Sequence, residues 1–138
     1  MSKEPSVERI AAAVARAVEG VREIAAVYLY GSSLAGRISR LSDIDLALVL
    51  PDEPDDPLFA ERIAARVGEE LGGDIEIDAH VAADLPLPVR GRVVTRGRLI
   101  YERDPSCRVE FETATRRLYF DFLPLLERDA REGLQAGG

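Results

Sequence analysis

The sequence predicts an α/β fold: a small mixed β-sheet flanked by helices, with a long helix at the C-terminal end. Three observations lead to this prediction. Segments with helical periodicity alternate along the chain with short runs of strand-forming residues. The chain has 138 residues and a mass of 15.1 kDa, which favours a single domain over residues 1–138. Hydrophobic residues make up 46% and charged residues 31%, as in ordinary globular proteins, and there is no internal repeat.

The first half of the chain alternates between the two kinds of element. A helix is expected over residues 6–19, because apolar residues recur at every fourth position and Gly20 can end it. Runs of β-branched, aliphatic and aromatic residues predict strands at 24–30 and 43–50. After a proline-rich turn, helical spacing returns over residues 58–71 and stops at two glycines.

The second half completes the pattern. Residues 74–81 alternate between apolar and polar, which predicts a strand with one face on the core. A proline-rich link and a short helical or irregular piece follow, and residues 97–102 form the last expected strand. A long helix is expected over about 106–134, with a kink at Pro124. The expected α/β core therefore spans about residues 24–102.

Charge and cysteine content exclude several classes of function. Acidic residues outnumber basic ones by 25 to 18, and the net charge of −7 argues against direct capture of nucleic acid or of an anionic membrane. The single cysteine excludes an intramolecular disulfide and a multi-cysteine zinc site. There is no secretory signal pattern and no apolar run of roughly 20 residues that could span a bilayer, so the cytoplasm is the expected compartment.

The most informative stretch joins a glycine turn to a pair of carboxylates. Gly31 and Ser32 directly follow a predicted strand, where backbone N–H groups and a hydroxyl can bind phosphate oxygens. Asp43 and Asp45 lie two apart on the next strand, so both carboxylates project from the same face. They would repel each other without a cation between them, and such hard oxygen ligands suit Mg²⁺ or Mn²⁺. Each motif alone is common, and their joint occurrence is the specific signal.

Gly-Ser, ten residues and then Asp-x-Asp-Leu on a strand resembles the nucleotidyltransferase domain of the DNA polymerase β superfamily. The C-terminal stretch GRLIYERDPSCRVEFETATRRLYFDFLPLLERDA resembles minimal nucleotidyltransferase (MNT) antitoxins, the partners of HEPN-domain toxins, and the resemblance covers about residues 24–128. It implies the polymerase β-type nucleotidyltransferase fold. One departure is that Ala35 precedes Gly36 where family members often have arginine, so Arg37 would have to supply that contact from a shifted position.

In that superfamily a third carboxylate from a neighbouring strand completes the metal site. The family pattern fits Asp78 best, with Glu76 as the alternative on the same face. His80 also shares this face and is expected to line the site or to be solvated, since histidine suits softer metals than Mg²⁺. From the residues alone, the strand could equally present a solvated outer face.

The resemblance implies an enzyme with a two-metal mechanism. Asp43, Asp45 and Asp78 would be catalytic and hold two Mg²⁺ ions, while Gly31 and Ser32 would bind the phosphates of ATP. AMP would pass to a tyrosine hydroxyl of a HEPN toxin, an RNase, and thereby neutralise it. Two alternatives stay open, namely a non-catalytic antitoxin that masks its toxin and an antibiotic-type nucleotidyltransferase that acts on a small molecule.

The long C-terminal helix carries more large apolar residues than one core-facing stripe needs. Tyr119, Phe120 and Leu123 could fill the groove where the helix turns, or they could form a docking surface for a partner or a second protomer. The chain offers no obvious acceptor-binding domain, so the acceptor is expected to be delivered by a partner protein.

Overall fold

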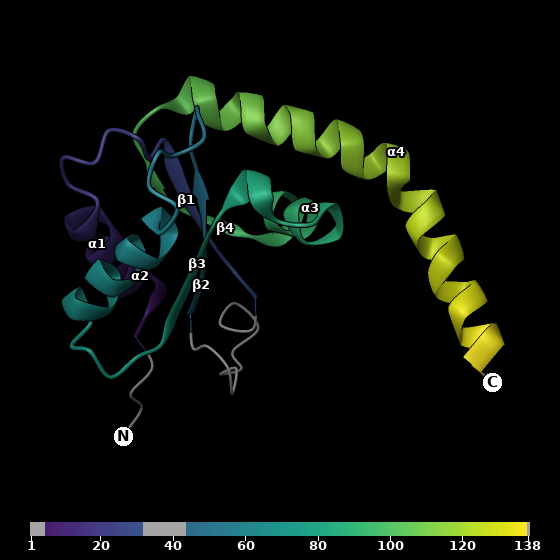
Figure 1. The fold of residues 1–138 in the computed structure, drawn as a ribbon, viewed down its shortest axis with the longest axis horizontal. Coiled ribbons are helices and arrows are strands. Elements are labelled where there is room, and N and C mark those ends of the chain that lie inside the picture. Colours follow the sequence, from purple (N-terminus) through teal and green to yellow (C-terminus); the bar gives the residue numbers. More distant parts are fainter. Residues whose placement is uncertain (1–4, 32–43, 138) are drawn as a thin grey trace.

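The computed structural model describes residues 5–31 and 44–137. Four strands form one sheet, and the helices pack on its two faces (Figure 1). In chain order the elements are α1 (Val7–Ala17), β1 (Ala26–Tyr30), β2 (Ile44–Val49), α2 (Phe59–Glu70), β3 (Ile77–Val81), the 3₁₀ turn η2 (Ala82–Asp84), α3 (Leu87–Arg96), β4 (Arg98–Glu102) and α4 (Pro105–Gly137). This order confirms the predicted α/β fold with a long C-terminal helix.

The sheet is mixed, as predicted, and its strands lie in the order β3-β2-β1-β4. Strand β1 is antiparallel to both β2 and β4, whereas β2 and β3 are parallel. Parallel neighbours need a crossover connection, and α2 supplies it between β2 and β3. Within the described chain, β3 and β4 are therefore the two edge strands.

The two faces of the sheet are covered differently. Helices α1 and α2 lie on one face and α3 and α4 on the other (Figure 1). On the first face a continuous apolar core joins Val14 and Val67 to Leu29, Leu46 and other aliphatic strand residues. The second face has a smaller core around Tyr28 and Val93, and its helices cover only part of the sheet. Burial of this kind is the main stabilising contribution to the fold.

Local signals explain several element ends. The side chain of Ser6 accepts a hydrogen bond from the backbone N–H of Arg9 at 3.1 Å, which caps α1 as the sequence predicts. The stretch left open as helical or irregular is the regular helix α3. Its prolines fall at the cap and in the first turn, where a missing N–H leaves no intrahelical hydrogen bond unmade.

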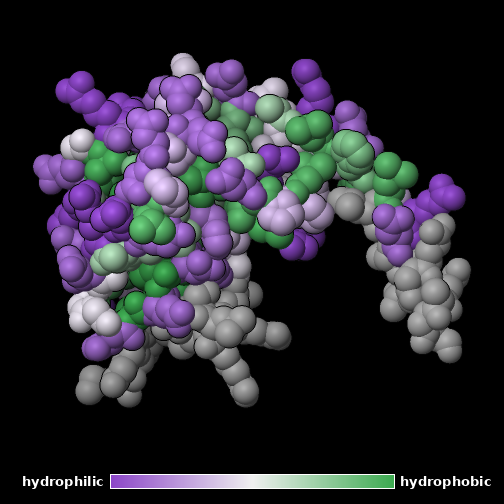
Figure 2. All heavy atoms as spheres, in the orientation of Figure 1, coloured by the Kyte–Doolittle hydropathy of each residue, from purple (hydrophilic) through white to green (hydrophobic). Residues whose placement is uncertain are grey.

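Helix α4 packs on α3 through its first half and then extends beyond the sheet. Tyr119 lies so close to Gly91 that a Cβ at this glycine would overlap the tyrosine ring. Beyond this contact Phe120, Phe122 and Leu125 are each about half exposed, and Figure 2 shows apolar side chains along the projecting part. The helix bends in its second half (Figure 1), and Pro124 is the proline within it. None of the described helices is long and apolar enough to cross a membrane.

Candidate active site

Three side chains form a row across neighbouring strands at one end of the sheet. Tyr30 on β1 is the register partner of Asp45 on β2, and Asp45 is in turn the partner of Asp78 on β3. Register partners project from the same face, so these three side chains lie next to one another on the face that carries α3 and α4. We call them the acid row. Each of its members is partly buried and so keeps some contact with solvent.

Gly31 is fitted against the acid row. Its φ of +84° lies in the left-handed region, which glycine adopts without steric penalty. A Cβ at this position would overlap the Oδ2 atom of Asp45 and lie 3.1 Å from its Cγ atom. Glycine is therefore required here for two independent reasons, and it holds the turn after β1 directly against the Asp45 carboxylate.

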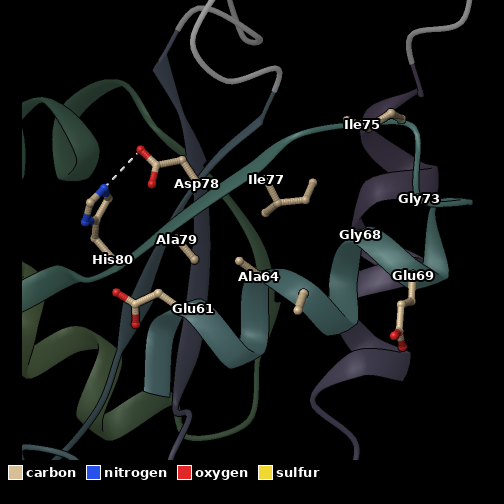
Figure 3. A pocket seen from close by; sticks show the side chains of 11 residues that line it. Glu61, Ala64, Gly68, Glu69, Gly73, Ile75, Ile77, Asp78, Ala79 and His80 are labelled. Carbon is tan, nitrogen blue, oxygen red and sulfur yellow. Dashed lines mark hydrogen bonds and ion pairs between the residues drawn. The ribbon is translucent and has the colours of Figure 1, made fainter. Parts of the chain in front are cut away.

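The register distinguishes the two candidates for the third carboxylate. Asp78 stands beside Asp45, whereas Glu76 precedes the first residue of β3, and its carbonyl accepts a hydrogen bond from the backbone N–H of Ile44 at 3.2 Å. His80, two residues further along β3, places its Nε2 atom 3.0 Å from Oδ2 of Asp78 (Figure 3). The strand pairing therefore places Asp78 beside Asp45, and the choice of Asp78 as the third metal ligand stays a prediction.

Tyr30 is the member of the row that the sequence did not single out. Burial raises the pKa of its hydroxyl to about 12, and the negative charges of Asp45 and Asp78 contribute to this shift. The neutral hydroxyl therefore persists beside the acids at physiological pH. In the sequence, the only indication of a role for Tyr30 is its position immediately before Gly31. The pairing of β1 with β2 is what shows that Tyr30 faces the carboxylates.

The carboxylate oxygens of Asp45 and Asp78 suit a hard divalent cation. Carboxylates on adjacent strands repel each other, and an ion of the Mg²⁺ class removes that repulsion while accepting oxygen ligands. The described residues contain no group of three or more histidine, cysteine or acidic side chains that could hold a metal ion. The expected ligand Asp43 and the expected phosphate contact Ser32 lie outside the described residues. The pair Asp45 and Asp78, with the glycine turn beside it, fits part of such a site.

The fold and this row of acids beside a glycine turn define a candidate nucleotidyl-transfer site. The polymerase beta nucleotidyltransferase family model matches residues 13–106, which is more than half of the chain. The chain therefore belongs to the polymerase beta nucleotidyltransferase family, and the superfamily predicted from the sequence motif is confirmed. No curated protein has a sequence that matches the chain significantly.

Solved structures support the same fold. A chain of a toxin–antitoxin crystal structure with AMP-PNP has a TM-score of 0.71 and 19% identity, covering 90% of this chain and 98% of that chain. A chain of the toxin–antitoxin MntA–HepT has a TM-score of 0.67 and 17% identity, with 91% and 97% coverage. The third structure is a complex of the tri-AMPylated Shewanella oneidensis HEPN toxin with MNT antitoxin. One chain of this complex has a TM-score of 0.70 and 16% identity, and the match covers 94% of this chain and 99% of that chain.

Proposed function

We propose that this protein is an antitoxin adenylyltransferase, which transfers AMP from ATP to a tyrosine hydroxyl of a HEPN-domain RNase toxin in the cytoplasm. The observation that carries the proposal is the pairing of Asp45 with Asp78 beside the Gly31 turn, in a chain of the nucleotidyltransferase family. The similar structures add the substrate and the partner, because they include AMP-PNP and an AMPylated HEPN toxin bound to an MNT antitoxin.

The carboxylates would bind two Mg²⁺ ions. Asp43, Asp45 and Asp78 would hold one ion near the acceptor, and Asp43 with Asp45 would also hold a second ion near the triphosphate of ATP. When bound, the ions neutralise the charge that develops on the attacking and leaving oxygens and lower the pKa of the acceptor hydroxyl. The carboxylates keep both reactants in one place, so positioning and charge neutralisation account for most of the rate.

The glycine turn would bind the leaving group. The backbone N–H groups at Gly31 and the hydroxyl of Ser32 donate hydrogen bonds to the β- and γ-phosphates. The tyrosine oxygen of the partner forms a bond to the α-phosphorus, and the bond from this phosphorus to the bridging oxygen breaks. Pyrophosphate leaves, and the tyrosine proton passes to solvent. No covalent intermediate with the enzyme forms.

The partner would bring the acceptor to this site. The net charge of −7 gives the protein a surface that attracts a basic protein, and an RNase that binds RNA is expected to be basic. The negative surface also disfavours RNA itself, so the partner and not a nucleic acid is the expected ligand.

The test is a transfer assay with α-labelled ATP, Mg²⁺ and, as acceptor, a HEPN-domain protein identified as the product of a gene adjacent to that of this protein. The proposal is supported if the wild-type protein and the exposed control variant Asp55→Asn label the partner and Asp45→Asn does not. Neutralisation of the toxin by Asp45→Asn as complete as by the wild type would instead identify a masking antitoxin. Label on an aminoglycoside and not on the partner would identify a small-molecule nucleotidyltransferase.

A further inference from the structure

Two hollows lie along the free edge of β3. The larger, of about 510 Å³, lies between α2 and β3, and the smaller, of about 220 Å³, lies toward the C-terminal end of the strand. Both are lined by Glu61, Ala79 and His80, so the two hollows adjoin, and we call them together the edge trough. Its α2 wall includes Ala65 and Glu69.

The edge trough is apolar at its floor and acidic at its rim. Ala64, Ile77 and Ala79 form part of the floor between α2 and β3 (Figure 3). Glu61 and Glu69 line it, and within the part of the chain that the structure describes neither forms an ion pair. No lysine or arginine of the described residues lines either hollow. The trough is therefore complementary to a segment that is positively charged and has short or apolar side chains between its charges.

The backbone of β3 is available for pairing along this trough. Among the described strands β3 is bonded only to β2, so its outer edge has no strand beside it. Such an edge can accept an extended peptide as an additional strand, with main-chain hydrogen bonds giving affinity and side-chain pockets giving specificity. Strand β3 (Ile77–Val81) offers about 16 Å of length, which is enough for roughly five residues of a bound segment.

The trough adjoins the acid row. Figure 3 shows Ile77 and Ala79 extending from one side of β3 toward α2, and Asp78 and His80 extending from the other side. Side chains of an added strand would alternate in the same way. A residue of that segment on the Asp78 side would lie at the acid row, while the residues before and after it would enter the trough. In the proposed mechanism Asp78 would help to hold the ion near the acceptor, so an acceptor docked along β3 would lie next to this carboxylate.

We propose that the edge trough docks the segment of the partner protein that carries the acceptor tyrosine, in an extended and cationic form paired with β3. The tyrosine lies on the Asp78 side, and basic neighbours in the trough contact Glu61 and Glu69. This inference rests on the proposed function, since it identifies how the acceptor of that same reaction is bound.

Two variants and two matched controls test the docking. Ala65→Trp fills the trough and Glu69→Lys reverses its charge, whereas Ala15→Trp and Glu19→Lys make the same changes at exposed positions on and just after α1. We expect each trough variant to slow AMP transfer to the HEPN-domain protein by about ten-fold or more, which corresponds to about 1.4 kcal/mol. The controls stay within about two-fold of the wild type, and all four variants bind ATP with Mg²⁺ as the wild type does.

The outcomes separate the two proposals. If the wild-type protein transfers no AMP, the proposed function fails. If the wild type is active and both Ala65→Trp and Glu69→Lys transfer AMP at its rate, the trough inference alone is overturned. Thermal unfolding of each variant shows whether a slow rate reflects loss of the fold. If one trough variant is slow because it is misfolded and the folded one transfers AMP at the wild-type rate, the inference is also overturned.

A crosslinking experiment identifies what occupies the trough. The photoreactive residue p-benzoylphenylalanine replaces Asp84, an exposed residue at the rim of the smaller hollow, in the full-length protein. The HEPN-domain protein is added, and the crosslinked peptides are mapped by mass spectrometry. Crosslinks within a few residues of the modified tyrosine support the proposal. Crosslinks to a distant segment of the partner or to a second copy of this chain, or no crosslink at all, contradict it. The same replacement at Ala15 is the control.

Discussion

Two tyrosines on the same face of β1 have contrasting surroundings. Tyr28 is only 2% exposed, lies under α3 and α4, and donates a hydrogen bond to the Glu112 carboxylate of α4. Tyr30, two residues further on, is half-buried and faces Asp45 and Asp78. The comparison shows that one strand face serves two purposes. Where the helices cover it, polar groups satisfy one another, and beyond the helices the same face carries the acid row.

The acids at the two ends differ in how their charge is compensated. At the covered end Arg108 lies 3.0 Å from Glu112 and Arg116 lies 3.9 Å from it, and the Tyr28 hydroxyl adds a further donor. At the open end the ion pair formed by Asp78 is with His80, whose side chain is itself about half exposed. Asp45 and Asp78 are neighbouring carboxylates, and their mutual repulsion is the reason to expect a cation between them.

The largest expected difference between the two ends is in catalysis. Asp45→Asn should slow AMP transfer by at least about a hundred-fold, because a lost metal ligand forfeits several kcal/mol of transition-state stabilisation. Glu112→Gln makes the same change of acid to amide at the covered end and should leave the transfer rate within about two-fold of the wild type. Steady-state rates of both variants measure the difference. Equal losses in the two would show that the acid row has no special role.

A second pair of variants tests the fit of the glycine turn. Gly31→Ala and Gly20→Ala both place a side chain at a positive φ, +84° and +81°, and each should lose about 1–2 kcal/mol of stability. Only at Gly31 does the new Cβ meet the Asp45 carboxylate, whereas at Gly20 there is open space. We expect Gly31→Ala to lose at least about ten-fold in transfer rate and Gly20→Ala to keep its rate, with ten-fold equal to about 1.4 kcal/mol. Similar rates for the two variants would remove the role assigned to this contact.

The third test concerns stability at the covered end. Tyr28→Phe removes the hydroxyl that donates to Glu112, so this largely buried carboxylate loses one of its donors. Hydrogen bonds to charged groups contribute about 1.5–3 kcal/mol, and we expect a loss in that range in urea denaturation. AMP transfer by the folded variant should remain unchanged. A variant as stable as the wild type would show that the arginines alone satisfy Glu112.

The last expected effect appears only at alkaline pH and concerns Tyr30. Its pKa is about 12 in the folded protein and about 10 when unfolded, so the unfolded chain loses this proton first. The contribution of Tyr30 is therefore fully present below pH 10 and is lost as the pH rises toward 12. Tyr30→Phe should show a shallower loss of stability between pH 10 and 12, measured by urea denaturation at each pH. An identical slope in the two proteins would contradict the placement of Tyr30 beside the acids.

The sequence predicted the order of elements well because each is encoded locally. Ser6 caps α1, the alternation around Asp78 marks β3, and the proline-rich stretch precedes α3. The acid row was only partly predictable, since Asp45 and Asp78 follow from a motif, whereas their neighbour Tyr30 depends on strand register. Register is set by turn geometry and by packing across the whole sheet, which no single segment specifies.

The edge trough was also beyond prediction from the sequence. Glu61 and Glu69 have the spacing of an ordinary solvated helix face, and the apolar residues of β3 have that of an ordinary core strand. Only the position of β3 at the edge of the sheet turns these two patterns into the walls of one depression. The projecting part of α4 is similar, because its apolar residues continue the stripe that packs on α3 but extend past the sheet.

The central claim is that Asp45 and Asp78 jointly hold a divalent ion next to the nucleotide. Mn²⁺ binding in the presence of AMP-PNP, followed by electron paramagnetic resonance, tests it without requiring the partner. The wild type and Asp55→Asn should bind Mn²⁺ equally well, while Asp45→Asn and Asp78→Asn should each bind it at least about ten-fold more weakly. Equal Mn²⁺ affinity in the wild type, Asp45→Asn and Asp78→Asn would contradict the claim.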